Sequence, residues 1–143
     1  MASWVEFEAA EPEFAKRVRK LMTRRKHLTM ATLRRDGSPR ISGTEIQFVD
    51  GQLRIGSMTG AVKAMDLRRD PRVAIHGPSN DPTKTGAWRG EAKIAGRAIE
   101  LEAEGGHAFR IDIAEAVITR LGGKGLIIES WSPERGHRSI DRA

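Results

Sequence analysis

The feature that most constrains this chain is a succession of short extended segments separated by tight-turn signals. Residues 27–57 read HLTMATLRRDGSPRISGTEIQFVDGQLRIGS, and two Asp-Gly pairs divide this stretch into three runs with strand-like patterning. Asp-Gly favours short hairpin turns, because those turns need positive backbone φ angles that Gly and Asp tolerate. The stretch therefore predicts a β-meander.

Extended runs also dominate the second half of the chain. Strand-like patterning recurs over residues 72–77, 87–101, 107–121 and 126–131, and GGKG at residues 122–125 marks a hairpin between the last two runs. Residues 77–86 are rich in Gly, Pro, Asn and Thr, and we expect an exposed, mobile loop there. Gly43, Gly56, Gly90 and Gly96 fall inside strand-like runs, where glycine marks a bend, a bulge or the close approach of another group, and bending is the commonest cause. Six or seven antiparallel strands favour a closed or nearly closed barrel, because closure removes sheet edges.

Two segments have helical periodicity instead. Pro12 begins the first, in which apolar residues recur at helical spacing until near His27. The second covers residues 60–70 and is stopped by Pro71. The sequence thus predicts one mainly β domain over residues 1–143 with two short helices, an N-terminal arm over residues 1–11 and a polar C-terminal tail over residues 132–143.

The chain lacks the residues that several classes of site require. It contains no cysteine, which excludes disulfides and thiolate metal ligands, and no histidine or carboxylate cluster at metal-ligand spacing. It has no phosphate-binding Walker loop and no G-x-G-x-x-G dinucleotide motif. No apolar run approaches the length that a membrane span needs, so we expect a soluble, cytoplasmic protein without a metal site.

Positive charge is concentrated near the N-terminus. The whole chain carries +6, whereas residues 12–40 contain ten Lys or Arg and two acidic residues. Such a segment could bind nucleic acid, an anionic membrane or a polyanionic small molecule, and a solvated helix face explains it equally well. Aromatic residues make up only 5% of the chain and tyrosine is absent, which disfavours the stacking platforms of nucleic-acid-binding barrels.

A polar turn, SMTG at residues 57–60, follows one predicted strand and directly precedes the second predicted helix. Ser57 falls on the same strand face as Leu53 and Ile55, so its hydroxyl is predicted to point inward. Free backbone N–H groups, hydroxyls and the helix dipole together would bind an anion. Alternatively, Ser57 or Thr59 caps the helix. The local pattern leaves both interpretations open.

Residues 30–77, MATLRRDGSPRISGTEIQFVDGQLRIGSMTGAVKAMDLRRDPRVAIHG, combine a DGSPR hairpin, a second Asp-Gly turn, a lysine six residues after Ser57, and an LRRDPRVA helix end. In order and spacing they resemble the pyridoxamine 5'-phosphate oxidase-like split barrels, which are flavin and deazaflavin oxidoreductases. The resemblance continues through WRGEAKIAGRA and IIESW. It implies an antiparallel split β-barrel and a homodimer with two cofactors at its interface.

The resemblance also implies a cofactor site, with the ring on the second strand and the phosphate over the SMTG turn. The residues it implies are Arg40, Ile41, Ser42, Gly43, Thr44, Ser57, Met58, Thr59, Gly60 and Lys63. Trp88, beside the predicted loop, either reaches across the dimer to the ring or substrate or anchors the core or the interface. His76, which ends a strand near this pocket, is a candidate proton donor.

The cofactor itself is predicted from a departure within the turn. In the flavin mononucleotide (FMN) oxidases of the family the turn typically ends in Ser-Arg-Lys, whereas this chain has Ala61-Val62-Lys63. The F420-dependent branch is more similar, which implies hydride transfer from reduced coenzyme F420 to an electron-poor double bond of a small organic substrate. The basic N-terminal segment would then meet the anionic F420 tail. An FMN-binding oxidoreductase is the first alternative, and a nucleic-acid-binding barrel without enzymatic activity is the second.

Overall fold

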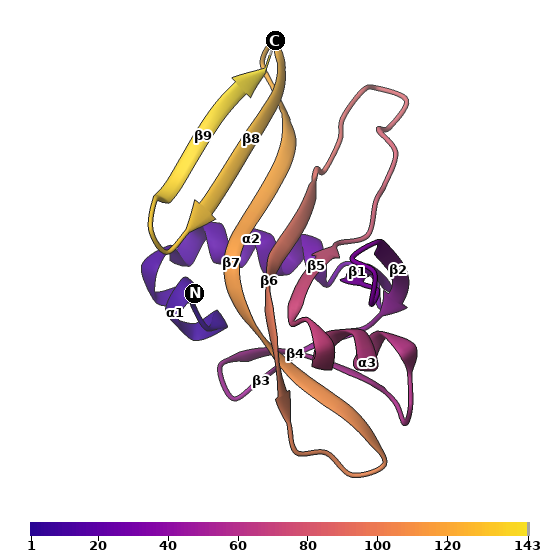
Figure 1. Cartoon of the computed structure of the whole chain (residues 1–143). Helices are drawn as coiled ribbons and strands as arrows, with labels where there is room; N and C mark the ends of the chain where they lie inside the picture. Colours follow the sequence, from indigo (N-terminus) through magenta and orange to yellow (C-terminus); the bar gives the residue numbers. More distant parts are fainter. Residues whose placement is uncertain (143) are drawn as a thin grey trace.

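The computed structural model describes residues 1–142 and contains three helices and nine strands (Figure 1). In chain order the elements are α1 (Trp4–Ala10), α2 (Pro12–Met22), β1 (Leu28–Leu33), β2 (Pro39–Thr44), β3 (Ile46–Val49), β4 (Gln52–Met58), α3 (Val62–Arg69), β5 (Arg72–His76), β6 (Glu91–Leu101), β7 (Gly106–Gly122), β8 (Gly125–Ser132) and β9 (Gly136–Arg142). No helix in residues 1–142 is long and apolar enough to cross a membrane.

All nine strands belong to one antiparallel sheet, which confirms the mainly β prediction. Seven of them follow the order β2-β1-β5-β6-β7-β4-β3, and the β8–β9 hairpin extends from β7. Strand β7 pairs with β6 along one edge and has two further partners, because it is 17 residues long. Its first part pairs with β4, and its last part pairs with β8. The two ends of β7 therefore belong to different parts of the molecule.

The sheet forms a split barrel rather than a closed one. Strands β2 and β3 are the two ends of the seven-strand path, and only Glu45 separates them in the chain. The continuous segment from β2 through Glu45 to β3 thus supplies both edge strands of this path. No hydrogen-bonded ladder joins β2 to β4. The opening between these two strands positions the candidate site described below.

The predicted Asp-Gly turns are confirmed, most clearly between β3 and β4. Asp50 and Gly51 both have positive φ angles, 52° and 72°, as a two-residue hairpin of this type requires. The glycine predicted to bend a strand at Gly96 is also confirmed. The pairing of β6 with β7 shifts register between Ala95 and Gly96, and a Cβ at Gly96 would collide with the Asp112 carbonyl.

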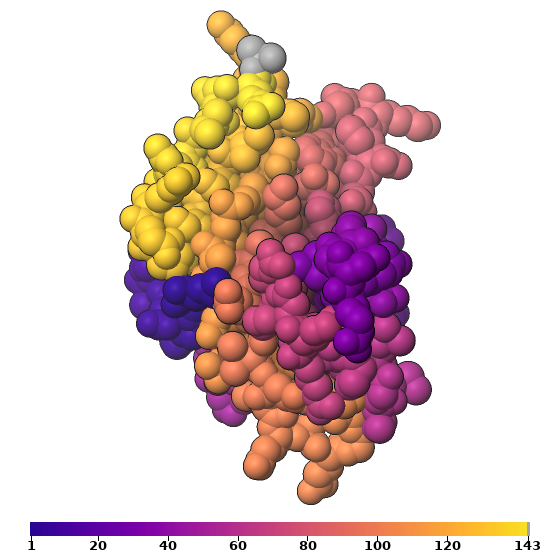
Figure 2. Space-filling view, in the orientation of Figure 1, coloured from indigo at the N-terminus to yellow at the C-terminus, as the bar shows by residue number. Residues whose placement is uncertain are grey.

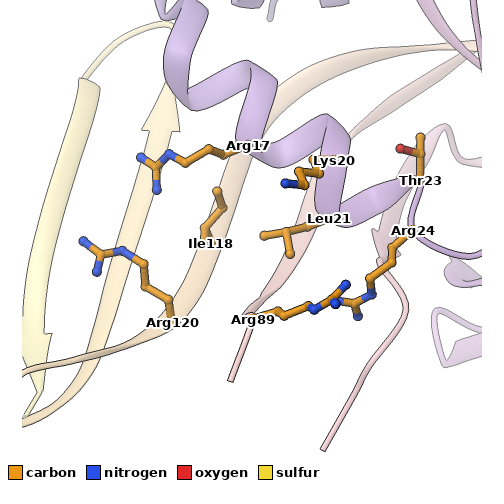
Figure 3. Close-up of a pocket in the computed structure, with 8 residues that line it drawn as sticks. All are labelled: Arg17, Lys20, Leu21, Thr23, Arg24, Arg89, Ile118 and Arg120. Atoms are coloured by element: carbon orange, nitrogen blue, oxygen red, sulfur yellow. The ribbon is translucent and has the colours of Figure 1, made fainter. Parts of the chain in front are cut away.

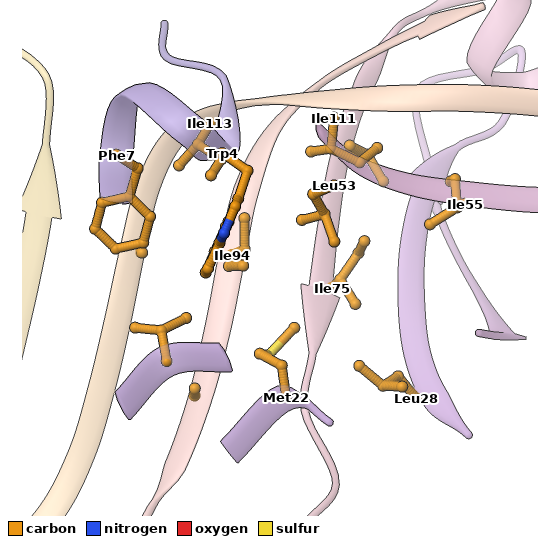
Figure 4. Packing of buried hydrophobic residues seen from close by; sticks show 14 of the residues in the cluster. Trp4, Phe7, Met22, Leu28, Leu53, Ile55, Ile75, Ile94, Ile111 and Ile113 are labelled. Carbon is orange, nitrogen blue, oxygen red and sulfur yellow. The ribbon is translucent and has the colours of Figure 1, made fainter. Parts of the chain in front are cut away.

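The hydrophobic core fills the barrel and continues under the two N-terminal helices (Figure 4). Helix α2 buries Phe14, Val18 and Met22, as its predicted apolar stripe requires. The ring of Phe7 in α1 stacks on Trp131 of β8, with 4.5 Å between ring centroids. Since burial of a large apolar side chain contributes about 1.5–3 kcal/mol, the helices are integral to the fold.

Within residues 1–142 the structure has three helices where the sequence predicted two, and both segments predicted only as an arm and a polar tail contain regular secondary structure. The expected N-terminal arm contains helix α1, which Ser3 and Glu6 cap reciprocally and which buries Trp4 and Phe7. The expected polar tail contains β9, whose residues are nearly all exposed and pair with β8. Neither segment has a long periodic pattern: α1 has only seven residues, and β9 is an edge strand without a buried face. Helix α2 also ends at Met22, earlier than His27.

The molecule has two distinct ends along β7. The β8–β9 hairpin and the segment before β6 project from one end, and the turn between β6 and β7 forms the other (Figures 1 and 2). The expected loop over residues 77–86 lies in the first of these projections and is exposed over residues 81–86. The two ends carry different clusters of polar side chains.

Candidate functional site

A cavity of about 510 Å³ lies where the ends of β2 and β4 meet the start of α3. We call it the β2–β4 cavity. It brings together five of the residues that the sequence predicted for the cofactor site: Gly43, Thr44, Ser57, Met58 and Lys63. Its other lining residues are His27, Glu45, Gln47, Gly56 and Gly105, which sequence reasoning did not assign to the site. Of these, only Gly56 gave a signal, as a glycine inside a strand.

Ser57 carries an unsatisfied polar atom into this cavity. Its Oγ atom is buried and has no hydrogen-bond partner among the described residues. Buried hydroxyls in folded proteins nearly always have such a partner, because an unpaired one costs about 1–3 kcal/mol of desolvation. This burial agrees with the inward orientation predicted for Ser57, and the hydroxyl lacks a partner among the described residues.

Helix α3 is not capped by a side chain, so the capping interpretation of the turn is wrong. Its N-cap residue is Ala61, and neither Ser57 nor Thr59 bonds to the first turn. The first intrahelical bonds run from Ala64 and Met65 to the Ala61 carbonyl. The N–H groups of Val62 and Lys63 therefore precede the helical ladder and have no acceptor within it.

Lys63 spans the opening between α3 and β2. Its Nζ atom donates a hydrogen bond to the Gly43 carbonyl at 2.7 Å, and no carboxylate within residues 1–142 forms an ion pair with it. The only carboxylate of the cavity, Glu45, lies 3.3 Å from Lys26 instead. An ammonium group has three donors. Two of the three donors of the Lys63 ammonium group therefore have no acceptor among residues 1–142, and no carboxylate compensates its charge.

The turn before α3 is held by a histidine that sequence reasoning did not single out. The Gly60 N–H donates to Nε2 of His107 at 3.0 Å, and Gly60 has a φ of 76°, which favours glycine. The Nδ1 atom of the same ring lies 3.4 Å from Arg68 Nη2 and 3.6 Å from Glu100. Hydrogen bonds from Arg68 lower the pKa of Glu100, so this carboxylate stays charged.

Arg40 does not line the cavity but anchors the strand that does. Its Nε atom donates to Asp66 Oδ2 at 2.7 Å, and Asp66 also accepts from Thr32 and Arg69 at 2.7 Å each. Burial raises the pKa of Asp66, but the hydrogen bonds from Arg40, Thr32 and Arg69 outweigh it and lower the pKa overall. This buried carboxylate joins β1, β2 and α3.

The remaining predicted residues lie beside the cavity or far from it. Ser42 is half-buried on β2, and Thr59 and Gly60 are exposed in the turn. Ile41 lines a separate cavity of about 400 Å³ on the outer face of β1, β5 and β6, together with His76. Trp88 precedes β6, whose first residue pairs with Thr119 near the far end of β7. Its Nε1 atom donates to the Asn80 carbonyl at 2.8 Å.

The two cavities adjoin through a third. A cavity of about 570 Å³ shares His27 with the β2–β4 cavity, and it shares Thr29 and His76 with the cavity that Ile41 lines. The three cavities therefore lie next to one another between Lys63 and the outer face of β1. His76 lines two of them, and its Nε2 atom lies 3.6 Å from Glu91.

Large apolar side chains stand exposed around these openings. Met58 is 84% exposed beside Ser57, Ile41 is 74% exposed on β2, and Val62 is more than half exposed at the start of α3. Isolated exposed apolar residues are ordinary in soluble proteins, but three such residues around connected cavities indicate a surface that a ligand or a partner covers.

Comparison with solved structures identifies the same fold. The chain is similar to an FMN-binding protein from Nostoc punctiforme related to pyridoxamine 5'-phosphate oxidase, with 12% identity, a TM-score of 0.67, and 93% of this chain and 96% of the other covered. PhzG from Burkholderia lata, in complex with tetrahydrophenazine-1-carboxylic acid, has 11% identity, a TM-score of 0.63 and coverage of 95% and 88%. A heme-binding protein from Mycobacterium smegmatis has 19% identity, a TM-score of 0.61 and coverage of 82% and 57%.

At these identities the structural similarities show the fold alone, and the family is shown by the sequence itself. No curated protein matches the chain. The model of the family described as pyridoxamine 5'-phosphate oxidase matches residues 14–122, which include the β2–β4 cavity and most of the sheet. The chain therefore belongs to the pyridoxamine 5'-phosphate oxidase family of split-barrel oxidoreductases.

Proposed function

We propose that this protein is an F420-dependent reductase that binds the deazaflavin cofactor along the β2–β4 cavity and the two cavities next to it. The observation that carries the proposal is the buried, unpartnered Ser57 hydroxyl in a cavity that also holds the Lys63 ammonium group. A phosphate oxygen is a strong acceptor and would satisfy both groups at once. The uncapped start of α3 adds a favourable dipole at the same place.

The preference for F420 over FMN rests on how few cations the turn supplies. Ala61 and Val62 stand where the FMN oxidases typically have serine and arginine, and Val62 is largely exposed. A missing arginine fork removes bidentate recognition of a terminal phosphate, in which each charge-assisted hydrogen bond contributes about 1.5–3 kcal/mol. A phosphodiester, which carries less charge than a terminal phosphate, suits the remaining pair of Ser57 and Lys63 better.

Reduced F420, when bound, supplies a hydride for addition to an electron-poor double bond, and a proton completes the reduction. The chain's own task is to hold donor and acceptor together and to exclude water. Solvent or His76 would deliver the proton, and His76 is hydrogen-bonded through Nδ1 to the Gly77 carbonyl at 2.6 Å. The physiological substrate would be a small organic molecule bound above the outer face of β1.

A homodimer would complete this site. The exposed side chains of Ile41, Met58 and Val62 surround the openings and would be buried by a second copy. Trp88 lies at the other end of its own β7, so any contact of Trp88 with the cofactor would come from the partner. Analytical ultracentrifugation tests the dimer: a monomer at micromolar concentration, with or without cofactor, would contradict the shared site.

The basic N-terminal segment divides between two places. Arg25 lines the cavity that shares His27 with the cofactor path, whereas Arg17, Lys20 and Arg24 line a different cavity. We therefore assign contact with the F420 tail to Arg25 and its neighbour Lys26. Replacing Arg25 with Gln should weaken long-tailed F420 more than tail-less F420, and the difference should vanish at high salt. Equal effects on both ligands would contradict this assignment.

FMN remains the first alternative, because the Nostoc protein of the same fold is described as FMN-binding. To separate the two, the purified protein is incubated with F420 or with FMN and desalted, and the absorbance that stays with the protein is recorded. Retained F420 without retained FMN supports the proposal, and retained FMN alone contradicts it. Titration against a single-stranded oligonucleotide at two salt concentrations tests the second alternative, a nucleic-acid-binding barrel.

A further inference from the structure

A second polar cavity lies at the opposite end of β7 from the β2–β4 cavity. It has a volume of about 700 Å³ and lies between helix α2, the start of β6 and the last part of β7 (Figure 3). We call it the α2–β7 cavity. Its lining residues are Arg17, Lys20, Leu21, Thr23, Arg24, Arg89, Ile118 and Arg120. Five of these eight side chains are cationic, and they come from three separate parts of the chain.

The positive charge of this cavity is mostly uncompensated. One buried carboxylate, Glu129, accepts hydrogen bonds from Arg17 at 2.7 Å and from Arg120 at 2.9 Å. Lys20, Arg24 and Arg89 form no ion pair with any carboxylate in residues 1–142. One negative charge thus faces five positive ones. Such an excess of positive charge around one cavity raises the local concentration of anions.

Three of the five cationic groups, those of Arg17, Arg24 and Arg120, are held in place by contacts within the chain. Arg17 and Arg120 are fixed by their shared contact with Glu129, which also lies 3.0 Å from His137. Arg24 is fixed by donation from Nη2 to the Pro78 carbonyl at 2.8 Å. Its Nη1 atom is buried and has no partner within the described chain. A bound anion would supply the hydrogen-bond acceptor that this buried guanidinium nitrogen lacks.

The α2–β7 cavity is separate from the cavity that holds Ser57 and Lys63. The α2–β7 cavity and the β2–β4 cavity share no lining residue. Gly105 lines the β2–β4 cavity and Ile118 lines the α2–β7 cavity, and the 13 residue steps from one to the other correspond to roughly 40 Å of extended strand at about 3.3 Å per residue. A ligand in the α2–β7 cavity is therefore distinct from a phosphate held at Ser57 and Lys63.

We infer that the α2–β7 cavity binds a small polyanion with three or more negative charges, such as an oligophosphate or a polycarboxylate. Its volume falls within the range of about 300–1,000 Å³ that small-molecule sites have. The charges converge on a hollow rather than forming a stripe, and no aromatic side chain lines it. These two features favour a compact anion over a nucleic acid, which needs a long track and stacking surfaces.

Calorimetric titration with tripolyphosphate and with citrate tests the inference and distinguishes phosphate from carboxylate chemistry. The cavity variant is Arg24→Gln with Arg89→Gln, and the matched control is Arg35→Gln with Arg138→Gln, which removes the same charge from exposed positions outside every cavity described above. We expect one site per chain in the wild type for at least one probe. Binding should weaken at least tenfold in the cavity variant and less than twofold in the control.

Further variants keep the test decisive. Lys20→Gln, at an exposed helix position, should weaken binding severalfold even if the double variant fails to fold. Lys63→Ala should leave tripolyphosphate and citrate binding unchanged, whether or not F420 is the cofactor. Absence of binding in the wild type would overturn the inference, as would equal losses in the cavity and control variants. Tighter binding of a mixed-sequence oligonucleotide than of either probe would also overturn it.

Discussion

The two ends of β7 show two different ways of presenting positive charge. The β2–β4 cavity has a single lysine, an unpartnered buried hydroxyl and an uncapped helix start. The α2–β7 cavity has five cationic side chains and one buried carboxylate. Each end also holds a buried acid that orients arginines: Asp66 near the first cavity and Glu129 near the second.

Local charge density therefore does not coincide with the proposed cofactor site. The most basic segment of the sequence contributes mainly to the α2–β7 cavity, whereas the family-related residues line the sparsely charged β2–β4 cavity. In the β2–β4 cavity the specific signal is the unsatisfied hydroxyl of Ser57.

Asp66→Asn should have the largest effect, lowering the free energy of unfolding by about 2–3 kcal/mol. The change leaves Arg40 and Arg69 without their buried carboxylate, and both are less than a third exposed. Denaturant titration at pH 7 measures the loss. The matched control is Asp112→Asn, whose more exposed carboxylate pairs with Arg110 at 3.3 Å, and it should cost less than about 1 kcal/mol.

Comparison of the wild type with Asp66→Asn as a function of pH tests whether Asp66 acts as a charged group. The pKa of Asp66 lies below its ordinary value of 3.8 in the folded chain, so its contribution is present above that value and is lost as the pH falls below it. The wild type should therefore lose its advantage over Asp66→Asn in acid. An advantage that stays constant from pH 7 to pH 2.5 would show that Asp66 does not act as a charged group.

Lys63→Ala should weaken F420 binding by roughly ten- to a hundredfold without changing the fold. One charge-assisted phosphate contact contributes about 1.5–3 kcal/mol, and about 1.4 kcal/mol corresponds to tenfold. Calorimetry on the wild type and the variant measures the change. Lys20→Ala, which removes an equal charge at the other end of β7, is the control and should leave F420 affinity unchanged. Equal losses of F420 affinity in both variants would show that the overall charge of the protein, and not a contact of Lys63, determines the effect.

Glu129→Gln should lower the free energy of unfolding by about 1–2 kcal/mol at pH 7, less than Asp66→Asn. Its partners Arg17 and Arg120 are 44% and 39% exposed, so water compensates part of the lost pairing. Hydrogen bonding from Arg17 lowers the pKa of Glu129 from 4.5 to about 2 despite burial. The wild-type advantage should thus fade between about pH 4.5 and pH 2. A larger loss in the free energy of unfolding than that of Asp66→Asn would contradict the argument that exposed arginine partners reduce the loss.

Ser57→Ala should have the smallest effect and an opposite sign for stability and binding. Removing a buried hydroxyl without a partner relieves its desolvation cost, so the free energy of unfolding should rise by up to about 1 kcal/mol. Phosphate recognition should weaken three- to tenfold. Thermal unfolding without ligand and calorimetry with F420 give the two values. A variant that is less stable without ligand would show that Ser57 serves the fold rather than a ligand.

Much of the fold follows from local sequence signals. The turn at Asp50-Gly51, the bulge at Gly96 and the apolar stripe of α2 depend on nearby residues, and all three are confirmed. Helix α1 and strand β9 were missed because tertiary contacts create them. Phe7 of α1 is buried against Trp131, and β9 exists through its pairing with β8.

The candidate site divides in the same way. Gly43, Ser57 and Lys63 could be placed together because a family resemblance linked segments that local reasoning treats separately. Arg40 and Asp66, which form an ion pair, are separated by 26 positions in the sequence. Gly60 and His107, which form a hydrogen bond, are separated by 47 positions. No spacing rule connects such pairs. The α2–β7 cavity was likewise invisible, since Arg89 and Arg120 reach α2 only in the folded chain.

The central claim is that the cavity formed by Ser57 and Lys63 binds a deazaflavin in preference to a flavin. Parallel calorimetric titrations of the wild-type protein with F420 and with FMN, in one buffer at one salt concentration, test it directly. The account predicts saturable F420 binding at least tenfold tighter than FMN binding, with the preference reduced in Lys63→Ala. Tighter binding of FMN than of F420 would contradict it.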